Sequence, residues 1–293
     1  MPSSTQHPRA TIAVIGGTGL DNIQGMTDVQ TVDLDTPFGK PSDVVTVGKL
    51  GGIGIAFLPR HGRGHFISPT ELPARANIYA LKSLGVEHII AVCSCGSFRE
   101  EYAPGHLLIP DQLIDRTRGR QSTFFTDGIV AHIAFADPFC PDLSRVLYEC
   151  SQEAGATVHH KGTYVCMEGP AFSTRAESKL YKAWGADIIG MTALPEAKLA
   201  REAEICYAVI ACVTDYDSWW APVAPVTVEA ILKTLAANVE TSRRIIRLAV
   251  GRIARQRTCE CATALATAIV TAPQRMPAAQ KQKLGLLIGK YVR

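Results

Sequence analysis

Short apolar runs alternate with helix-like segments along most of the chain, and this alternation is the feature that most limits its fold. Residues 11–15, 88–92 and 205–214 are apolar, rich in β-branched side chains, and typical of buried strands. Amphipathic stretches that stop at a glycine, such as 72–84 and 142–154, are typical of helices. Strands that alternate with helices favour an α/β fold around a mostly parallel or mixed sheet.

Further segments continue this pattern, and a glycine pair between two of them predicts a β-hairpin. The other predicted strands are 44–50, 54–58, 107–113, 158–165 and 187–191, and the other predicted helices are 173–184, 194–203 and 226–250. We find neither an internal repeat nor a low-complexity linker. We therefore expect one domain over residues 1–257, with residues 258–293 as a tail that packs on this domain or extends it.

Composition disfavours several classes of protein. Of the 293 residues, 47% are hydrophobic and 19% are charged, which is not the composition of a mainly disordered chain. The net charge of +3 is too small to indicate nucleic-acid binding. No apolar run approaches the roughly 20 residues that a membrane span needs. Residues 1–15 do not resemble a secretory signal, which favours a cytoplasmic protein.

Nine cysteines are scattered along the chain. An odd number without dense spacing argues against the disulfide framework of a secreted protein. The two C-x-C pairs, Cys93/Cys95 and Cys259/Cys261, lack the C-x-x-C spacing that is common in zinc sites and redox motifs. We therefore predict no metal site, and we interpret most cysteines as small, reduced, buried hydrophobic residues.

Polar or glycine-rich segments follow several predicted strands, which is where α/β sheets bind ligands. The Gly-Gly-Thr-Gly loop at 16–19 can surround a phosphate with backbone N–H groups, and it is also typical of a plain turn. Its spacing fails the G-x-G-x-x-G fingerprint, which disfavours an NAD-dependent dehydrogenase. Arg60 and His61 offer hydrogen-bond donors to an oxyanion, or form a solvated basic loop.

Two more segments carry candidate binding groups. Phe172 precedes a predicted helix start, where an aromatic ring either stacks on a planar base or packs in the core. Asp215 and Asp217 directly follow an apolar strand. Two carboxyls buried close together raise the pKa of one of them, so that one can hold or donate a proton. An Asp-rich turn or a helix cap is the alternative interpretation.

These motifs, in this order and at these intervals, resemble the trimeric purine nucleoside phosphorylases. The resemblance covers about residues 11–235. It is carried by Gly16–Gly19, Thr36–Gly39, Arg60–Gly62, Gly96–Ser97, Glu168–Pro170, Phe172–Ser173, Met191–Thr192, Pro195–Glu196 and Thr214–Asp217. It implies a single α/β domain with a distorted central mixed β-sheet flanked by helices.

The resemblance also implies an activity. It implies a pentosyltransferase that cleaves a nucleoside with inorganic phosphate as co-substrate, without a metal or organic cofactor, in a homotrimer or a dimer of such trimers. Aspartate at position 215 points to the branch that converts 5'-methylthioadenosine to adenine and 5-methylthioribose 1-phosphate. Phosphorolysis of 6-oxopurine nucleosides such as inosine, and a non-catalytic nucleotide-binding role, are the alternatives.

By the same resemblance, each candidate residue has an implied role. Phosphate would be held by Thr18, Arg60, His61, Cys93, Ser94 and Thr192. The nucleoside would contact Phe172, Met191, Asp215 and Asp217, with His132 of a neighbouring subunit and Val228, Ile231 and Leu232 around its 5' group. Asp215, Asp217 and His61 would act in catalysis: a protonated Asp215 would donate to the base N7, and Asp217 would accept from the 6-amino group. The family commonly has Thr-Ala at the positions of Cys93 and Ser94.

Overall fold

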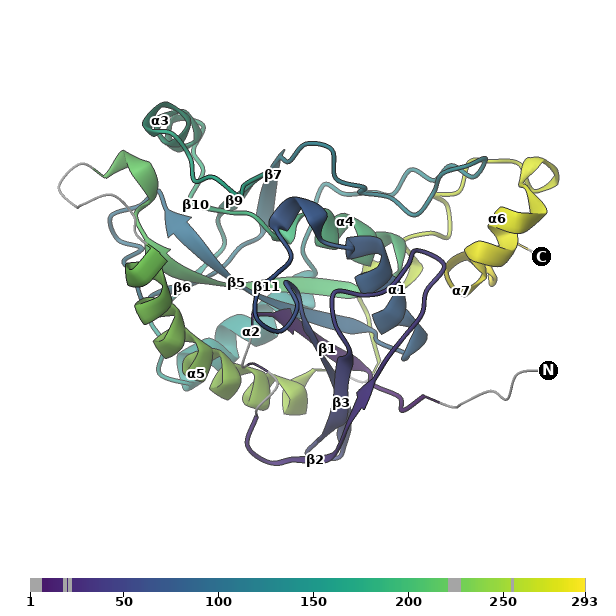
Figure 1. The fold of residues 1–293 in the computed structure, drawn as a ribbon, viewed down its shortest axis with the longest axis horizontal. Coiled ribbons are helices and arrows are strands. Elements are labelled where there is room, and N and C mark those ends of the chain that lie inside the picture. The colour runs from purple at the N-terminus through teal and green to yellow at the C-terminus, as the bar shows by residue number, and fades with distance from the viewer. Residues whose placement is uncertain (1–6, 18–19, 21–22, 221–227, 254–255, 293) are drawn as a thin grey trace.

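The structure, a computed structural model, describes residues 7–17, 20, 23–220, 228–253 and 256–292. In its longest helix, the side chains of 228–233 and 235–236 lie outside this description. Figure 1 shows a central sheet with helices on both sides and a C-terminal segment that projects at one end. The α/β class with a mixed central sheet, as predicted, is confirmed.

The sheet contains eleven strands among the described residues. Along its main path the order is β2-β3-β4-β1-β5-β10-β9-β7, while β11 pairs with β5 and β6, and β6 pairs with β8. The strands are β1 (Ile12–Gly16), β2 (Met26–Val32), β3 (Val45–Leu50), β4 (Ile53–Pro59), β5 (His88–Ser97), β6 (Leu107–Ile109), β7 (Gln112–Arg116), β8 (Val158–His160), β9 (Thr163–Met167), β10 (Ile188–Gly190) and β11 (Cys206–Asp215).

On one side of β5, the neighbouring strand changes along its length. The first half of β5 lies parallel between β1 and β11, whereas Gly96 and Ser97 pair antiparallel with β10. β1 pairs with β5 only as far as Ala91, so residues 92–95 meet no described strand on that side. The carboxyl ends of β1, β4 and β11 therefore surround a stretch of β5 that is open along one edge, as expected for a ligand site in an α/β sheet.

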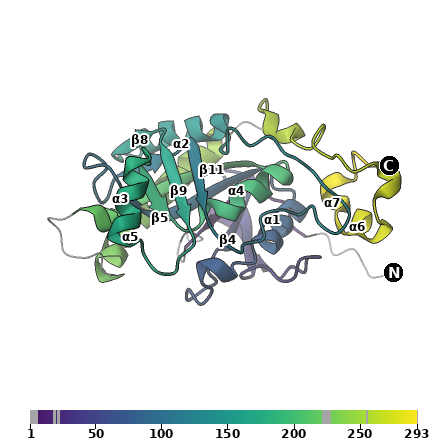
Figure 2. The ribbon, with the colours of Figure 1, turned by 90° about the horizontal axis from the view of Figure 1, so that it is seen from above.

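Helices cover both faces of the sheet. α2 and α5 pack together on one face, and α1 and α4 pack together on the other (Figure 1). Figure 2 shows α3 and the α6–α7 pair at opposite ends of the molecule. The helices are α1 (Ala74–Ser83), α2 (Pro141–Glu153), α3 (Arg175–Ala183), α4 (Ala193–Glu202), α5 (Val228–Arg252), α6 (Ala278–Lys283) and α7 (Gly285–Ile288), with 3₁₀ turns η1 (Pro69–Glu71), η2 (Asp217–Trp219), η3 (Glu260–Thr263) and η4 (Pro273–Arg275).

Side-chain alternation along the strands builds two core layers. Ile12 and Val14 of β1 belong to the apolar cluster that α2 and α5 cover. Ala13 and Ile15 belong to the cluster that α1 and α4 cover. Strand side chains point to opposite faces in turn, so a strand buried on both faces appears in the sequence as a continuous apolar run.

Two predicted strands are divided, and one strand is not predicted at all. Residues 107–113 form β6 and β7, because Pro110 between them has no N–H to donate to a ladder. Residues 158–165 form β8 and β9, because Lys161 and Gly162 between them have φ of 68° and 147°. β2 is the strand that the sequence does not predict, because most of its residues are exposed and form no buried apolar run.

The C-terminal segment contributes to the main core. Leu265, Met276 and Leu284 are buried in the same apolar cluster as α1 and α4. A bridge between Ala131 and Ile269 also ties this segment to the long loop that precedes α2. No described helix is long and apolar enough to cross a membrane.

Candidate active site

Arg60 follows β4, and its guanidinium lies where β1 and β5 separate. Its Nε and Nη2 donate to the Glu196 carboxylate of α4 at 2.5 and 3.1 Å. Its Nη1 donates to the Val92 carbonyl and its Nη2 to the Ile15 carbonyl, at 3.0 and 3.4 Å. Arg60 and Glu196 are each 2% exposed. Four of the five guanidinium N–H groups are thus used inside the protein, which leaves one for an anion.

His61 lies beside Arg60 and is neutral at physiological pH. Burial, and then the positive charge of Arg60, lowers its pKa to about 4. Its Nδ1 is 2.8 Å from the Ile67 carbonyl, which only accepts hydrogen bonds. Nδ1 therefore carries the proton and Nε2 is an acceptor. Such a ring can accept a hydrogen bond from the hydroxyl of monohydrogen phosphate.

Two more of the predicted phosphate residues are buried nearby. Cys93 lies in β5 with its Sγ 3.8 Å from the Tyr164 hydroxyl, and burial raises the pKa of its thiol. Thr192 immediately precedes α4, and its hydroxyl makes no capping hydrogen bond to the helix. Cys93 and Thr192 lie close enough to interact. Thr18 lies outside the described residues.

Ser94 is exposed on the open edge of β5. Alternate residues of a strand direct their backbone groups to the same side. The Ser94 N–H therefore points to the side on which the Val92 carbonyl meets Arg60. This N–H is a better donor for an oxyanion than the Cys93 thiol.

Asp215 and Asp217 lie at the carboxyl end of β11. The Asp215 oxygens accept hydrogen bonds from the Asp217 N–H and the Thr214 hydroxyl, both at 2.8 Å. The Ser173 hydroxyl lies 3.0 Å from each oxygen of Asp217. Burial raises the pKa of both carboxyls above the ordinary value, although these hydrogen bonds oppose the effect. Either acid is therefore easier to protonate than an exposed one.

β5 connects the two groups of residues. Cys93 lies beside the Arg60 group, and Gly96 contacts the Asp215 carboxylate. Three residues of extended strand span about 10 Å. Arg60 and His61 on one side, and Asp215 and Asp217 on the other, are thus far enough apart to admit a sugar between a phosphate and a planar base.

Arg120, which no motif predicted, connects the loops before α3 and α4. Its guanidinium donates to the Glu168 carboxylate at 3.0 Å and to the Met191 and Leu194 carbonyls at 2.6 and 2.7 Å. The Arg120 side chain is only 3% exposed. No local pattern in the sequence identifies Arg120 as a site residue, because its hydrogen-bond partners lie far away in the sequence and meet it only in the folded chain. These bonds hold the loop of Phe172 against that of Met191.

Residues 11–251 match the family model of the Phosphorylase superfamily. The chain belongs to this superfamily. Two relatives named S-methyl-5'-thioadenosine phosphorylase are similar to it over nearly their full length. The one from Geobacter sulfurreducens is 58% identical and covers 96% of this chain and 99% of its own. The one from Koribacter versatilis is 53% identical and covers 97% of each chain.

Solved structures of high similarity bear related names. A methylthioadenosine phosphorylase from an antarctic soil metagenomic library has a TM-score of 0.92 at 47% identity, over 96% of this phosphorylase and 99% of that chain. The methylthioadenosine phosphorylase of Schistosoma mansoni in complex with adenine has a TM-score of 0.81 at 34% identity, over 96% and 98%.

The remaining predicted residues of this phosphorylase occupy different surroundings. Phe172 is 49% exposed, so the core-packing interpretation is wrong. Met191 is partly buried, with its side chain against Gly169. His132 is exposed, and its backbone N–H donates to the Ala268 carbonyl of the C-terminal segment. The side chains of three predicted residues lie outside the description: Val228, Ile231 and Leu232.

Proposed function

We propose that this phosphorylase converts 5'-methylthioadenosine and phosphate to adenine and 5-methylthioribose 1-phosphate. The observation that carries the proposal is a pair of neighbouring carboxyls, the partly buried Asp215 and the buried Asp217, about 10 Å along β5 from Arg60. A 6-amino group is a hydrogen-bond donor and needs an acceptor, which Asp217 supplies. The names of relatives that are 53–58% identical support the same substrate.

The chemistry follows from where charge develops. As the N9–C1' bond breaks, its electron pair goes to the purine and the ribose becomes positive, while a phosphate oxygen forms the new bond to C1'. The Arg60 charge and the Ser94 N–H hold the phosphate in place for that attack. A protonated Asp215 donates its proton to N7 and neutralises the departing base. In this proposal, neither a metal nor an organic cofactor takes part.

Other predicted residues surround the substrate in this scheme. The exposed ring of Phe172 offers a face on which the base stacks, and Met191 lies against the ribose. Thr18, His61, Cys93 and Thr192 complete the contacts to phosphate. We place the reaction in the cytoplasm.

An assay of adenine release tests the proposal directly. Methylthioadenosine, adenosine and inosine are each supplied with and without phosphate. We expect purine release only with phosphate, fastest from methylthioadenosine. Equal release without phosphate would indicate a hydrolase, and faster release from inosine would indicate a 6-oxopurine phosphorylase.

The 5' group of the substrate gives a finer test. In the sequence Ile231 and Leu232 follow Val228 by three and four residues, a spacing typical of one helix face. If that face lines the 5' pocket, it prefers a methylthio group over a hydroxyl by about 10–200-fold in kcat/KM. Equal kcat/KM for adenosine and methylthioadenosine would contradict this assignment.

We also propose that the chain acts as a homotrimer, or as a dimer of trimers, in which His132 reaches the 5' pocket of a neighbour. Its exposed position, from which it can reach a neighbouring subunit, supports this role. His132→Ala and Asp215→Asn chains, each nearly inactive alone, are co-expressed and their mass in solution is measured. Mixed trimers should regain activity at about a quarter of their sites, because those sites combine an intact Asp215 with a neighbour's intact His132. Mixed assemblies without recovery would show that His132 acts within its own chain.

A further inference from the structure

Four cysteines from separate parts of the chain meet at one point. Cys140 immediately precedes α2, Cys206 begins β11, and Cys259 and Cys261 lie at the start of η3. Their Sγ atoms all lie within 4.8 Å of one another, and those of Cys206 and Cys259 are 3.3 Å apart. Cys259 is partly exposed, whereas the other three are buried. The proposed reaction uses none of them.

Backbone hydrogen bonds hold these segments together independently of the sulfur atoms. The Cys140 N–H donates to the Tyr207 carbonyl at 2.9 Å, directly after Cys206. The Arg257 guanidinium donates to the Glu204 carbonyl at 2.6 Å and so fixes the approach to η3. The four thiols are therefore gathered by the fold itself, as a preformed ligand set would be.

We propose that Cys140, Cys206, Cys259 and Cys261 bind a single zinc ion as a tetrahedral site with four thiolate ligands. A Zn–S bond of about 2.3 Å places the sulfurs of such a site about 3.8 Å apart. The Cys206–Cys259 separation of 3.3 Å lies below that value and the 4.8 Å limit on all pairs lies above it, so shifts of about 1 Å complete the geometry. Soft thiolates select zinc among the divalent ions common in proteins.

The charges around the cluster suit bound thiolates. A zinc ion with four thiolates carries a net charge of −2, because binding releases the thiol protons to solvent. The positive charge of Arg201 lies close enough to Cys261 to interact with it, and Arg257 lines the hollow beside Cys206 and Cys259. These cations offset part of the negative charge of the four bound thiolates.

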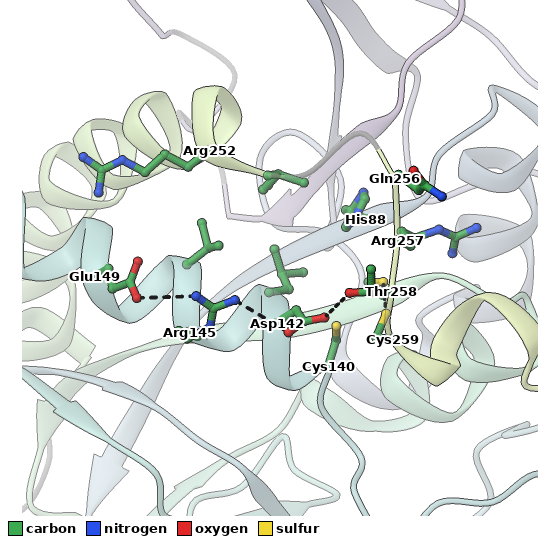
Figure 3. A pocket seen from close by; sticks show the side chains of 14 residues that line it. His88, Cys140, Asp142, Arg145, Glu149, Arg252, Gln256, Arg257, Thr258 and Cys259 are labelled. Carbon is green, nitrogen blue, oxygen red and sulfur yellow. Dashed lines mark hydrogen bonds and ion pairs between the residues drawn. The ribbon is translucent and has the colours of Figure 1, made fainter.

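A hollow of about 240 Å³ leads to the cluster. Figure 3 shows Cys140 and Cys259 close together beside Thr258, with His88 on the other side of Thr258 from Cys140. His88 lies opposite Cys206 in the β5–β11 ladder, is 7% exposed, and has an Nδ1 without a hydrogen-bond partner. An N–H on that ring can hydrogen-bond a ligating thiolate, as residues behind metal ligands commonly do. The ion enters past the exposed side of Cys259.

This zinc site is structural and separate from the active site. Cys206 and Asp215 are the two ends of β11, about 30 Å apart along an extended strand. Four protein ligands also fill a tetrahedral shell and leave no position for substrate. The ion stabilises the attachment of the C-terminal segment to α2 and β11, contrary to the expectation from sequence of a chain without a metal site.

The metal content of the wild-type chain is the first test. The full chain is produced with zinc in the medium and purified with a phosphine reductant and without chelator, and its metals are measured by plasma mass spectrometry. We expect about one zinc per chain. Replacement of zinc by Co²⁺ should produce sulfur-to-cobalt charge-transfer absorption and the visible bands of a tetrahedral ion. Removal of zinc should lower Tm and leave the ranking of nucleoside substrates unchanged.

Variants then locate the ion. Cys261→Ser should lower zinc affinity at least about tenfold. Cys150→Ala is the matched control, because Cys150 is also buried on α2 but lies outside the cluster, and it should retain its zinc. Zinc that binds Cys261→Ser with the parent's affinity would overturn the proposal by placing the ion elsewhere.

Thiol titration of the denatured chain, prepared without reductant, separates the alternatives. Nine thiols and no zinc would show that the four cysteines are simply reduced. Five thiols and no zinc would show that they form two disulfides. Either result overturns the proposal, whether or not the chain proves to be a phosphorylase of methylthioadenosine.

Discussion

Gly96 of β5 stands directly against Asp215 of β11. A Cβ at Gly96 would lie 2.9 Å from the Asp215 Oδ1, closer than real Cβ atoms come, and 3.1 Å from the Asp217 Cβ, which is tighter than most Cβ contacts. The φ of Gly96 is not in the left-handed region, so this position requires glycine for space and not for backbone conformation. β5, which leads from the predicted phosphate-binding residues to the predicted base-binding acids, thus sets the positions of Asp215 and Asp217.

Gly96→Ala should therefore displace the Asp215 carboxylate and lower kcat/KM for methylthioadenosine by about 10–100-fold. Gly251→Ala is the matched control, because nothing lies within 4 Å of a Cβ at Gly251, and it should retain the parent's kinetics. Steady-state kinetics and Tm are measured for both variants. Parental kcat/KM in a folded Gly96→Ala would show that the position of Asp215 does not matter for the reaction.

Asp215→Asn should change which base is accepted. The amide keeps a donor but loses the titratable proton, so methylthioadenosine cleavage should fall while relative activity on inosine rises. The shift in preference should be at least about tenfold, because buried hydrogen-bonding groups discriminate strongly between partners. Asp28→Asn is the control, because Asp28 forms an exposed ion pair with Lys49. An unchanged substrate ranking in the folded variant would show that Asp215 does not determine which base the enzyme accepts.

Arg60→Ala should lower both stability and turnover. It leaves the Glu196 carboxylate buried without its cation, which costs about 3–5 kcal/mol of unfolding free energy, and turnover should fall at least about 100-fold. The double variant Arg60→Met/Glu196→Leu separates the two effects, because it removes both charges. We expect it to recover most of the Tm but to keep a KM for phosphate raised at least about tenfold. A parental KM for phosphate would limit Arg60 to a structural role.

The free energy of unfolding should fall as pH rises, because Glu202 is buried. Glu202 is 4% exposed, accepts hydrogen bonds from the Thr123 hydroxyl and the Phe124 N–H at 2.6 and 2.7 Å, and burial raises its pKa from 4.5 to about 7. Between these values the folded state holds a proton that the unfolded state releases. The stabilisation is complete below pH 4.5 and is lost by about pH 7, which amounts to about 3 kcal/mol.

Glu202→Gln measures this contribution. The amide keeps an acceptor for Phe124 and a donor for Thr123, without titrating. The free energy of unfolding of the variant, measured from pH 4.5 to 8, should decline less with pH than that of the parent. Glu101→Gln, at an exposed position, is the control. Identical pH slopes for the parent and Glu202→Gln would mean that Glu202 is ionised throughout this range.

Much of the architecture follows from local pattern. Strands buried on both faces are continuous apolar runs, so the patterns of β1 and β11 predict them almost to their ends. β5, in contrast, continues to Ser97, past its predicted end at Val92, because its polar second half is paired by β10 and β11. Asp215 and Asp217 are predictable for the same local reason, since they directly follow an apolar strand.

The partners of the buried charges and thiols depend on the fold. Glu196 neutralises Arg60 from 136 residues away. Together with the Val92 and Ile15 carbonyls it leaves Arg60 with one free donor, in place of the open fork that its motif predicts. Arg120 finds its carbonyls only when three loops converge, and Cys140 meets Cys261 only because α2, β11 and η3 all begin at the same place. Periodicity reports which faces of an element are buried, because burial repeats with the geometry of that element. Contact between distant residues has no such repeat, so only the packed structure decides it.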